Sequence, residues 1–306
     1  MREFKNIVVG LALDSDGGAV TLGSQKAAQQ AIWVAKANGG RIRFVHSTFA
    51  NDYSTPVTGA AAGMVHEGVP EAGRKALEAV VAETRNSGVE ADLVVTEDRP
   101  WMDITRMALR ETVDLVVVGK RNEKPEDGRR LGSESINLLR KCPTPVWVVR
   151  PEHDLVHRLV LAATDLSDVG DRATRYASDV AVRHECELHV VHAWQLPFEL
   201  QMESPRMSED EFAAEVEKLK QASSDHILGA LEEGRTAKLH LGRGTPSQVI
   251  REAVNHLDPD LLVMGTISRT GIAGLVLGST AERMLGLVDC SILTVKPEGF
   301  ETTVEL

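Results

Sequence analysis

The chain repeats itself at a constant offset of 146 residues, and this repeat limits its possible folds more than any other feature. The segment DLVVVG, which begins at Asp114, matches DLLVMG, which begins at Asp260. The same offset relates four further pairs of positions: Pro100 and Pro246, His46 and His192, Gly132-Ser133 and Gly278-Ser279, Arg150-Pro151-Glu152 and Lys296-Pro297-Glu298. A shared offset across separate segments predicts a duplicated structural unit. We therefore expect two domains, 1–152 and 153–306.

Within each unit, short apolar runs alternate with longer segments of helical period. This pattern is typical of strand–helix–strand units that form a parallel sheet covered by helices on both faces. The first unit predicts strands at 7–13, 42–47, 91–96, 115–119 and 146–149, and helices at 24–37, 71–87, 101–111 and 133–141. The second predicts strands at 159–164, 188–193, 237–241, 261–265 and 292–295, and helices at 171–183, 209–232, 246–255 and 279–287. Each unit is thus expected to be an open five-stranded α/β sheet that binds ligands at the carboxyl ends of its strands.

Charge and composition exclude several classes of protein. The formal net charge is −11, and the first 150 residues carry 20 basic and 19 acidic side chains while the remainder carries 14 and 26. A generic nucleic-acid binder needs a surplus of basic side chains, so we expect no nucleic-acid partner. No segment approaches the roughly 18 uninterrupted apolar residues of a membrane span, and the start has no signal-peptide core, so we expect a cytoplasmic protein without a membrane partner.

Cysteine and histidine spacing gives no strong metal signal. Cys142, Cys186 and Cys290 are far apart, so buried reduced thiols are expected rather than disulfides or a four-thiolate zinc site. His153 and His157 have helical i,i+4 spacing, but no carboxylate or thiol is reliably placed beside them, and we assign no metal ligands. His46 and His192 occupy matching positions near the end of the second strand. We expect a shared structural hydrogen bond to a neighbouring carbonyl, and we assign no catalytic residue.

A connection with glycines links the strand that ends at Gly265 to the helix that opens at Gly278-Ser279. The backbone amides of a helix N-terminus favour an anion, and glycines let the backbone approach phosphate oxygens closely. No Gly-Lys-Ser/Thr occurs, so this is not a Walker loop. An alternative is an ordinary connection in which the glycines make turns and Ser279 caps the helix.

The spacing Gly265-x2-Ser268-x9-Gly278-Ser279, the strand-end Asp165 and the short last strand after Cys290 together resemble the universal stress protein family. The duplication is similar to the tandem, E-type members, and the resemblance covers nearly the whole chain. It implies a flavodoxin-like (Rossmann-like) fold in each unit with strand order 3-2-1-4-5. In the nucleotide-binding branch of the family it also implies a site for ATP, which Mg²⁺ would accompany.

The resemblance assigns roles to seven residues of the second unit. It puts Asp165 against the adenine, Ala193 beside the base, Gly265 and Ser268 along the ribose and phosphates, and Gly278, Ser279 and Thr280 around the phosphate chain. Ser268 stands where the family pattern has glycine; a side chain there can crowd the loop, although its hydroxyl can donate a hydrogen bond. Asp165 has an alternative role as a turn or helix-cap residue.

The first unit departs further from the family pattern. It keeps the spacing as Gly119-x2-Asn122-x9-Gly132-Ser133, but Glu134 stands where the second unit has Thr280. A carboxylate suits the helix dipole at that position and repels a phosphate. Asp14 matches Asp165 in role, after which the first unit has a longer connection. We expect the first unit to have lost the nucleotide site or changed its ligand.

These observations favour a stress-response regulator that binds ATP in the second domain, with at most slow hydrolysis. A nucleotide-independent scaffold for unidentified protein partners is the alternative, as is a different small ligand in the first domain. The short terminal strands can pair between units or between chains, because an edge strand offers unpaired amides and carbonyls. Pairing between chains, which would form a homodimer, is therefore one of the two alternatives.

Overall fold

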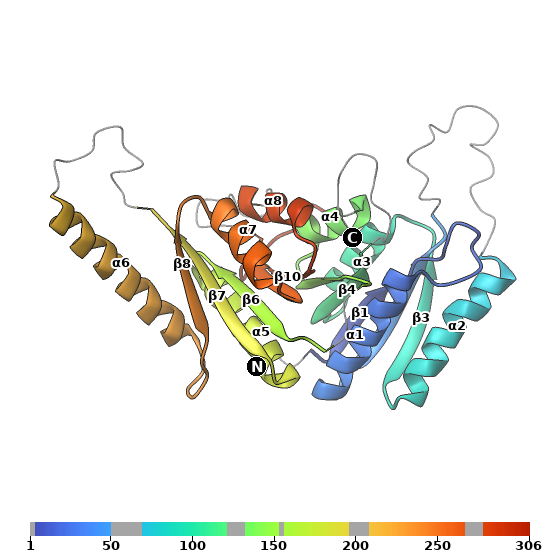
Figure 1. The fold of residues 1–306 in the computed structure, drawn as a ribbon. Helices are drawn as coiled ribbons and strands as arrows, with labels where there is room; N and C mark the ends of the chain where they lie inside the picture. The colour runs from blue at the N-terminus through green and yellow to red at the C-terminus, as the bar shows by residue number, and fades with distance from the viewer. Residues whose placement is uncertain (1–3, 50–68, 121–131, 153–155, 196–207, 267–277) are drawn as a thin grey trace. The chain divides into compact units, whose positions relative to one another are not determined.

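The computed structural model describes residues 4–49, 69–120, 132–152, 156–195, 208–266 and 278–306 (Figure 1). The chain divides into two compact units. The N-terminal unit comprises residues 2–155 together with the C-terminal segment 301–306, and the C-terminal unit comprises residues 156–300.

The N-terminal unit is a parallel sheet with helices on both faces. Its strands are β1 (Asn6–Gly10), β2 (Arg41–Ser47), β3 (Glu90–Thr96), β4 (Leu115–Gly119) and β5 (Val146–Val149). Its helices are α1 (Leu22–Asn38), α2 (Glu71–Asn86), α3 (Pro100–Arg110) and α4 (Ser133–Lys141). All pairs are parallel and the strands lie in the order β3-β2-β1-β4-β5, which confirms the predicted order and class.

The C-terminal unit repeats this arrangement. Its strands are β6 (Leu159–Thr164), β7 (Glu187–Trp194), β8 (Lys238–Arg243), β9 (Leu261–Gly265) and β10 (Ser291–Val295). Its helices are α5 (Asp168–His184), α6 (Glu209–Ala230), α7 (Pro246–Leu257) and α8 (Ser279–Leu287). The strands pair in parallel in the order β8-β7-β6-β9-β10, again as predicted.

The helices form two layers in each unit. In the N-terminal unit α1 packs on β4 and neighbours α2, whereas α3 packs on β2 and neighbours α4 (Figure 1). In the C-terminal unit α5 packs on β6 and neighbours α6, whereas α7 packs on β7 and neighbours α8. Pro100 and Pro246 occupy the first turn of α3 and α7, as the sequence predicted, because the fixed φ of proline suits that position.

The core follows from burial of the central strands on both faces. Leu115–Val118 of β4 and Leu261–Met264 of β9 are buried, as are residues 160–163 of β6. The edge strands β3 and β8 consist largely of half-buried or exposed residues. Among the described residues, no helix has both the length and the hydrophobicity that a bilayer crossing requires.

The first strand is shorter than predicted. The first strand was expected to reach residue 13, but β1 ends at Gly10. The chain then turns into a short hairpin in which Leu13 bridges Val20 in antiparallel fashion. The amide of Thr21 donates to the carbonyl of Ala12 at 3.0 Å, which closes the hairpin before α1 begins.

Candidate functional site

The connection between β9 and α8 is closed at its base. Thr266 follows Gly265 and donates its amide to the carbonyl of Val295 at 3.0 Å. The amide of Gly278 donates to the carbonyl of Thr266 at 2.7 Å, which holds the two ends of the connection together. Ser268, a predicted site residue, lies outside the described residues with the rest of 267–277. Sequence reasoning missed Thr266, whose counterpart at the repeat offset is Lys120.

The N-cap residue of α8 has no side chain that could cap the first amides. Gly278 is the N-cap residue, with φ −57° and ψ 140°, and Ser279 is the first helical residue. The N-cap position of this helix therefore belongs to Gly278 and not to Ser279. Thr280, the second helical residue, is half-buried. Because glycine offers no acceptor to the first turn, the helix dipole and the first amides favour an anion here.

Asp165 follows β6 and is exposed. One carboxylate oxygen, Oδ1, accepts from the backbone amide of Ser167 at 3.2 Å and from the Ser167 hydroxyl. Leu166, between them, has φ 59°, a left-handed conformation that a branched residue rarely adopts. The structure thus shows the turn role for Asp165. Contact with an adenine stays a prediction.

Gly170 fixes the position of this turn. A Cβ atom at Gly170 would lie 2.5 Å from Oγ1 of Thr164 and 2.9 Å from Oδ1 of Asp165. The same Thr164 oxygen accepts from the amide of Leu166 at 3.0 Å. Sequence reasoning missed Gly170, because the predicted helix began at Asp171 and the glycine was placed before it. In the structure α5 begins at Asp168, so a glycine within its first turn was the available signal.

Two histidines make the structural bonds that the repeat predicted. His192 Nδ1 lies 2.9 Å from the carbonyl oxygen of Thr164, and His46 Nδ1 lies 3.0 Å from that of Leu11. A carbonyl can only accept, so each Nδ1 donates. Burial lowers the pKa of both imidazoles. They stay neutral near pH 7 and tie the second strand of each unit to the end of the first.

The sequence-predicted residues gather at one edge of the C-terminal sheet. Ala193 is half-buried near the end of β7, Asp165 follows β6 and Gly265 ends β9. Because β6 lies between β7 and β9, these three residues share the carboxyl edge at the point where the strand order reverses. In open α/β sheets this is the usual ligand position. Gly278 joins them through its bond to Thr266.

The N-terminal unit uses its strand-end aspartate differently. Oδ1 of Asp14 accepts from the amides of Gly18 at 2.9 Å and Ala19 at 3.2 Å, inside the hairpin that follows β1. Asp14 and Asp165 both accept from backbone amides of the turn that follows them, and a shared role toward a ligand stays a prediction. The longer connection after Asp14 folds back and supplies the amides that bind its carboxylate.

Glu134 is also bound within the N-terminal unit. Its Oε2 accepts from the backbone amide of Trp101 at 3.0 Å, near the start of α3. Burial raises the pKa of Glu134, while the Trp101 bond and the charge of Arg99 oppose that rise. A carboxylate thus fills the position at which the C-terminal unit has Thr280.

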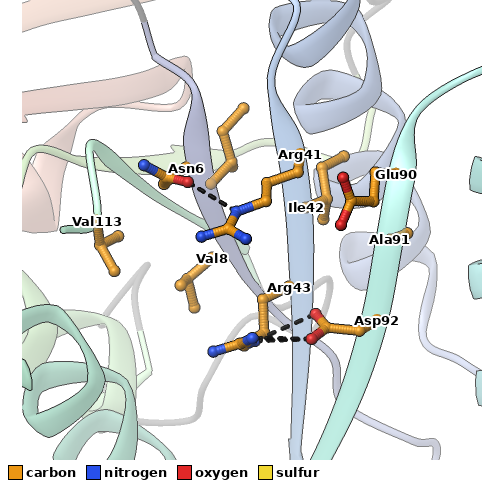
Figure 2. Close-up of a pocket in the computed structure, with 10 residues that line it drawn as sticks. Asn6, Val8, Arg41, Ile42, Arg43, Glu90, Ala91, Asp92 and Val113 are labelled. Atoms are coloured by element: carbon orange, nitrogen blue, oxygen red, sulfur yellow. Dashed lines mark hydrogen bonds and ion pairs between the residues drawn. The ribbon is translucent and has the colours of Figure 1, made fainter. Parts of the chain in front are cut away.

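A cavity in the N-terminal unit lies far from these residues, at the amino ends of β1, β2 and β3. Figure 2 shows Arg41 donating to Oδ1 of Asn6 at 2.8 Å and Arg43 paired with Asp92 at 2.9 Å. The cavity has a volume of about 40 Å³, which is enough for roughly one water. Ligand pockets usually exceed about 300 Å³. Within the described ranges, no three His, Cys, Asp or Glu side chains form a group that could hold a metal ion.

Comparison with known proteins identifies the family. The pattern of the universal stress protein family matches residues 3–150 and again residues 157–296. The chain belongs to the universal stress protein family. It carries two family domains in tandem, as the repeat and the resemblance predicted.

Two curated relatives are similar to this universal stress protein over most of their length. It is 24% identical to universal stress protein E of Photorhabdus laumondii over 328 aligned residues, which cover 100% of this chain and 99% of the relative. It is 26% identical to universal stress protein E of Escherichia coli over 239 residues, which cover 72% and 73%.

Solved structures confirm the fold of this universal stress protein. A functionally unknown protein from Pseudomonas aeruginosa matches with a TM-score of 0.70 and 22% identity, covering 97% of this chain and 94% of the other. A universal stress protein from Archaeoglobus fulgidus matches with a TM-score of 0.64 and 18% identity, covering 97% and 99%.

Proposed function

We propose that this universal stress protein is a cytoplasmic stress-response regulator whose C-terminal domain binds ATP and hydrolyses it slowly at most. One observation carries the proposal. The start of α8, whose N-cap residue Gly278 has no side chain, lies at the carboxyl edge that also bears Asp165 and Gly265. Amides at a helix N-terminus bind phosphate oxygens with the helix dipole in their favour.

A binding role fits the side chains better than efficient phosphoryl transfer does. Asp165 is the carboxylate predicted for this site, and its Oδ1 already accepts twice from Ser167. A group engaged in a turn is poorly placed as a general base or a holder of Mg²⁺. Regulation needs only different affinities of a ligand for two states of the protein.

The N-terminal domain is proposed to bind no nucleotide. Glu134 brings a carboxylate to the start of α4, where it would repel a phosphate. Asp14 is engaged by the amides of Gly18 and Ala19. Both changes affect the positions that correspond to the proposed ATP site.

Release of bound nucleotide from matched variants tests the proposal. The purified full-length protein is denatured and its supernatant is separated by anion exchange; near-stoichiometric ATP or ADP is expected. Gly278→Val should abolish retention, whereas Gly132→Val should leave it unchanged. Both variants should fold, since both glycines have extended backbones that valine tolerates. A Cβ atom at Gly132 meets nothing within 4 Å. Circular dichroism verifies that both variants fold.

A nucleotide-independent scaffold is the second candidate, favoured by the engagement of Asp165 in its own turn. Absence of nucleotide from the supernatant, together with no calorimetric heat on titration of ATP with Mg²⁺, would overturn ATP binding and support the scaffold. Loss of retention in both glycine variants would contradict the assignment to the C-terminal domain. A different retained molecule would point to another ligand in the N-terminal domain.

A further inference from the structure

Two histidines of the C-terminal unit share a hydrogen bond at the amino end of the sheet, opposite to the proposed ATP site. Nδ1 of His189 on β7 lies 2.9 Å from Nε2 of His240 on β8, and the two ring planes differ by 21°. His189 is 4% exposed and His240 is half-buried. Nε2 of His189 lies 3.1 Å from Glu187, which also pairs with Lys238 at 2.6 Å.

The direction of each bond follows from the chemistry of the groups. Ionised Glu187 can only accept, so Nε2 of His189 carries a proton and donates to it. In a neutral imidazole the other nitrogen then has no proton, so Nδ1 of His189 accepts and Nε2 of His240 donates. One added proton on the far nitrogen of His240 leaves this bond intact. A second proton, on Nδ1 of His189, breaks it because two donors then face each other.

The groups around the pair disfavour a charge on His240. On β6, the residues paired with Glu187 and His189 are Leu159 and Leu161, which carry no charge. Lys238 on β8 and His256 near the end of α7 both act on His240. Burial, followed by His189, His256 and Lys238, lowers the pKa of His240. Burial, together with the permanent charge of Lys238, therefore opposes protonation of His240.

The N-terminal unit has permanent charges at the equivalent place. Arg43 stands 146 positions before His189, and it pairs with Asp92 at 2.9 Å and with Glu111 at 2.6 Å. The bond to Asp92 raises the pKa of Arg43 further above its ordinary value, against the effect of burial. A guanidinium stays charged at every physiological pH, whereas imidazoles change charge near pH 6.

We propose that the His189–His240 pair is an acid-sensitive latch on the edge strand β8, which opens when acid adds the second proton and leaves two donors facing each other. Helix α7 is expected to move together with β8, because the two elements are closely packed. A Cβ atom added at Gly242 of β8 would lie 2.5 Å from Val249 of α7. Acid thus loosens β8 and α7, while the ion pairs of Arg43 with Asp92 and Glu111 are retained in the N-terminal unit. The latch does not depend on ATP binding.

Hydrogen–deuterium exchange of the full-length protein tests the latch. After correction for the intrinsic pH dependence of exchange, protection of peptides covering 238–243 should fall about tenfold between pH 7.5 and 5.5, as expected for the loss of one hydrogen bond. Peptides covering 90–96 should not change. His240→Val introduces the residue found at Val94, its counterpart in the repeat, and should remove the response. His226→Asn, which alters an exposed histidine paired with Asp171, should retain it.

Equal protection of 238–243 at both pH values would overturn the proposal, as would an unchanged response in His240→Val. If that variant does not fold, nitrogen NMR of the imidazoles in the unmodified protein decides. We expect the two rings to titrate in separate, coupled steps. Independent titration of both rings near pH 6.5, their ordinary value, would contradict a shared proton.

Discussion

Oε2 of Glu134 lies 3.0 Å from the backbone nitrogen of Trp101, so a side chain of α4 caps the neighbouring helix α3. The N-cap residue of α3 is Arg99, which has no acceptor in its side chain. In the C-terminal domain, Gln248 of α7 instead accepts from the hydroxyl of its own N-cap, Thr245, at 2.6 Å. Thr280 stands where the N-terminal domain has Glu134, so the two domains differ in how the start of this helix is bound.

Removal of this cap should destabilise the N-terminal domain. Glu134→Ala leaves the Trp101 amide without its acceptor, and we expect a loss of about 1–2 kcal/mol in the free energy of unfolding. Glu134→Gln keeps an acceptor and should lose less. Urea unfolding provides the measurement, with Glu83→Ala on the exposed side of α2 as the control. Equal stability of Glu134→Ala and the control variant would show that the cap contributes little.

An aspartate contact that occurs in both domains fixes the first strand of each domain. Oδ2 of Asp260 accepts from the amides of Arg158 at 2.6 Å and Leu159 at 3.0 Å. Asp114 accepts from Lys5 and Asn6 in the same way. Burial raises the pKa of Asp260, but these backbone bonds outweigh it and the net pKa is lowered.

We expect Asp260→Ala to cost about 2–4 kcal/mol, because two amides lose a charged acceptor. A lowered pKa in the folded state means that the stabilisation by Asp260 is present above its unfolded value of about 4 and is lost as the pH falls below it. Urea midpoints at pH 7 and pH 3.5 measure this. A similar loss for Asp225→Ala, at an exposed position of α6, would contradict a specific role.

Local sequence determined most of the architecture. β4 and β9 have their predicted bounds, because buried apolar runs are framed by an aspartate before them and a glycine at their end. The bonds of His46 and His192 could be predicted because the repeat placed both at the same point of the fold. The family resemblance then located the candidate edge of the sheet.

Contacts that depend on how the chain folds around each residue could not be predicted from the sequence pattern. The bond between Glu134 and Trp101 joins residues 33 apart on two helices, so its existence depends on how those helices pack. The hairpin after β1 replaced a predicted extension of the strand, since Asp14 binds amides that only the folded turn presents. The closeness of Gly170 to Asp165 has the same origin.

His184 should make the C-terminal domain less stable in mild acid. Its ring lies parallel to that of His157, with centroids 4.2 Å apart, and burial lowers its pKa from 6.5 to about 4 although Asp260 opposes the shift. Below pH 6.5 the unfolded chain therefore takes up a proton that the folded domain refuses until about pH 4. Stability should fall across this window by on the order of 1–2 kcal/mol, reduced by partial solvent exposure.

His184→Asn tests this dependence, since Asn38 is the counterpart of His184 in the repeat. Urea unfolding at pH 7.5 and pH 5 should give a smaller difference in the variant than in the unmodified protein. His226→Asn should leave the difference unchanged, because His226 is exposed beside Asp171. The explanation fails if His184→Asn keeps the full pH dependence.

Gly170 offers a last test that links folding to the proposed site. In Gly170→Ala the added methyl would lie 2.5 Å from Oγ1 of Thr164 and 2.9 Å from Oδ1 of Asp165, so the turn must shift. We expect a loss of about 1–3 kcal/mol in stability and weaker retention of nucleotide. Gly229→Ala, in α6 with open space around the new methyl, should instead gain about 0.5–1 kcal/mol from helix propensity. Thermal unfolding and nucleotide content measure both effects. If Gly170→Ala loses stability but retains nucleotide fully, the position of Asp165 does not control nucleotide binding. If its stability is unchanged, the close approach of Gly170 to Thr164 and Asp165 does not constrain the turn.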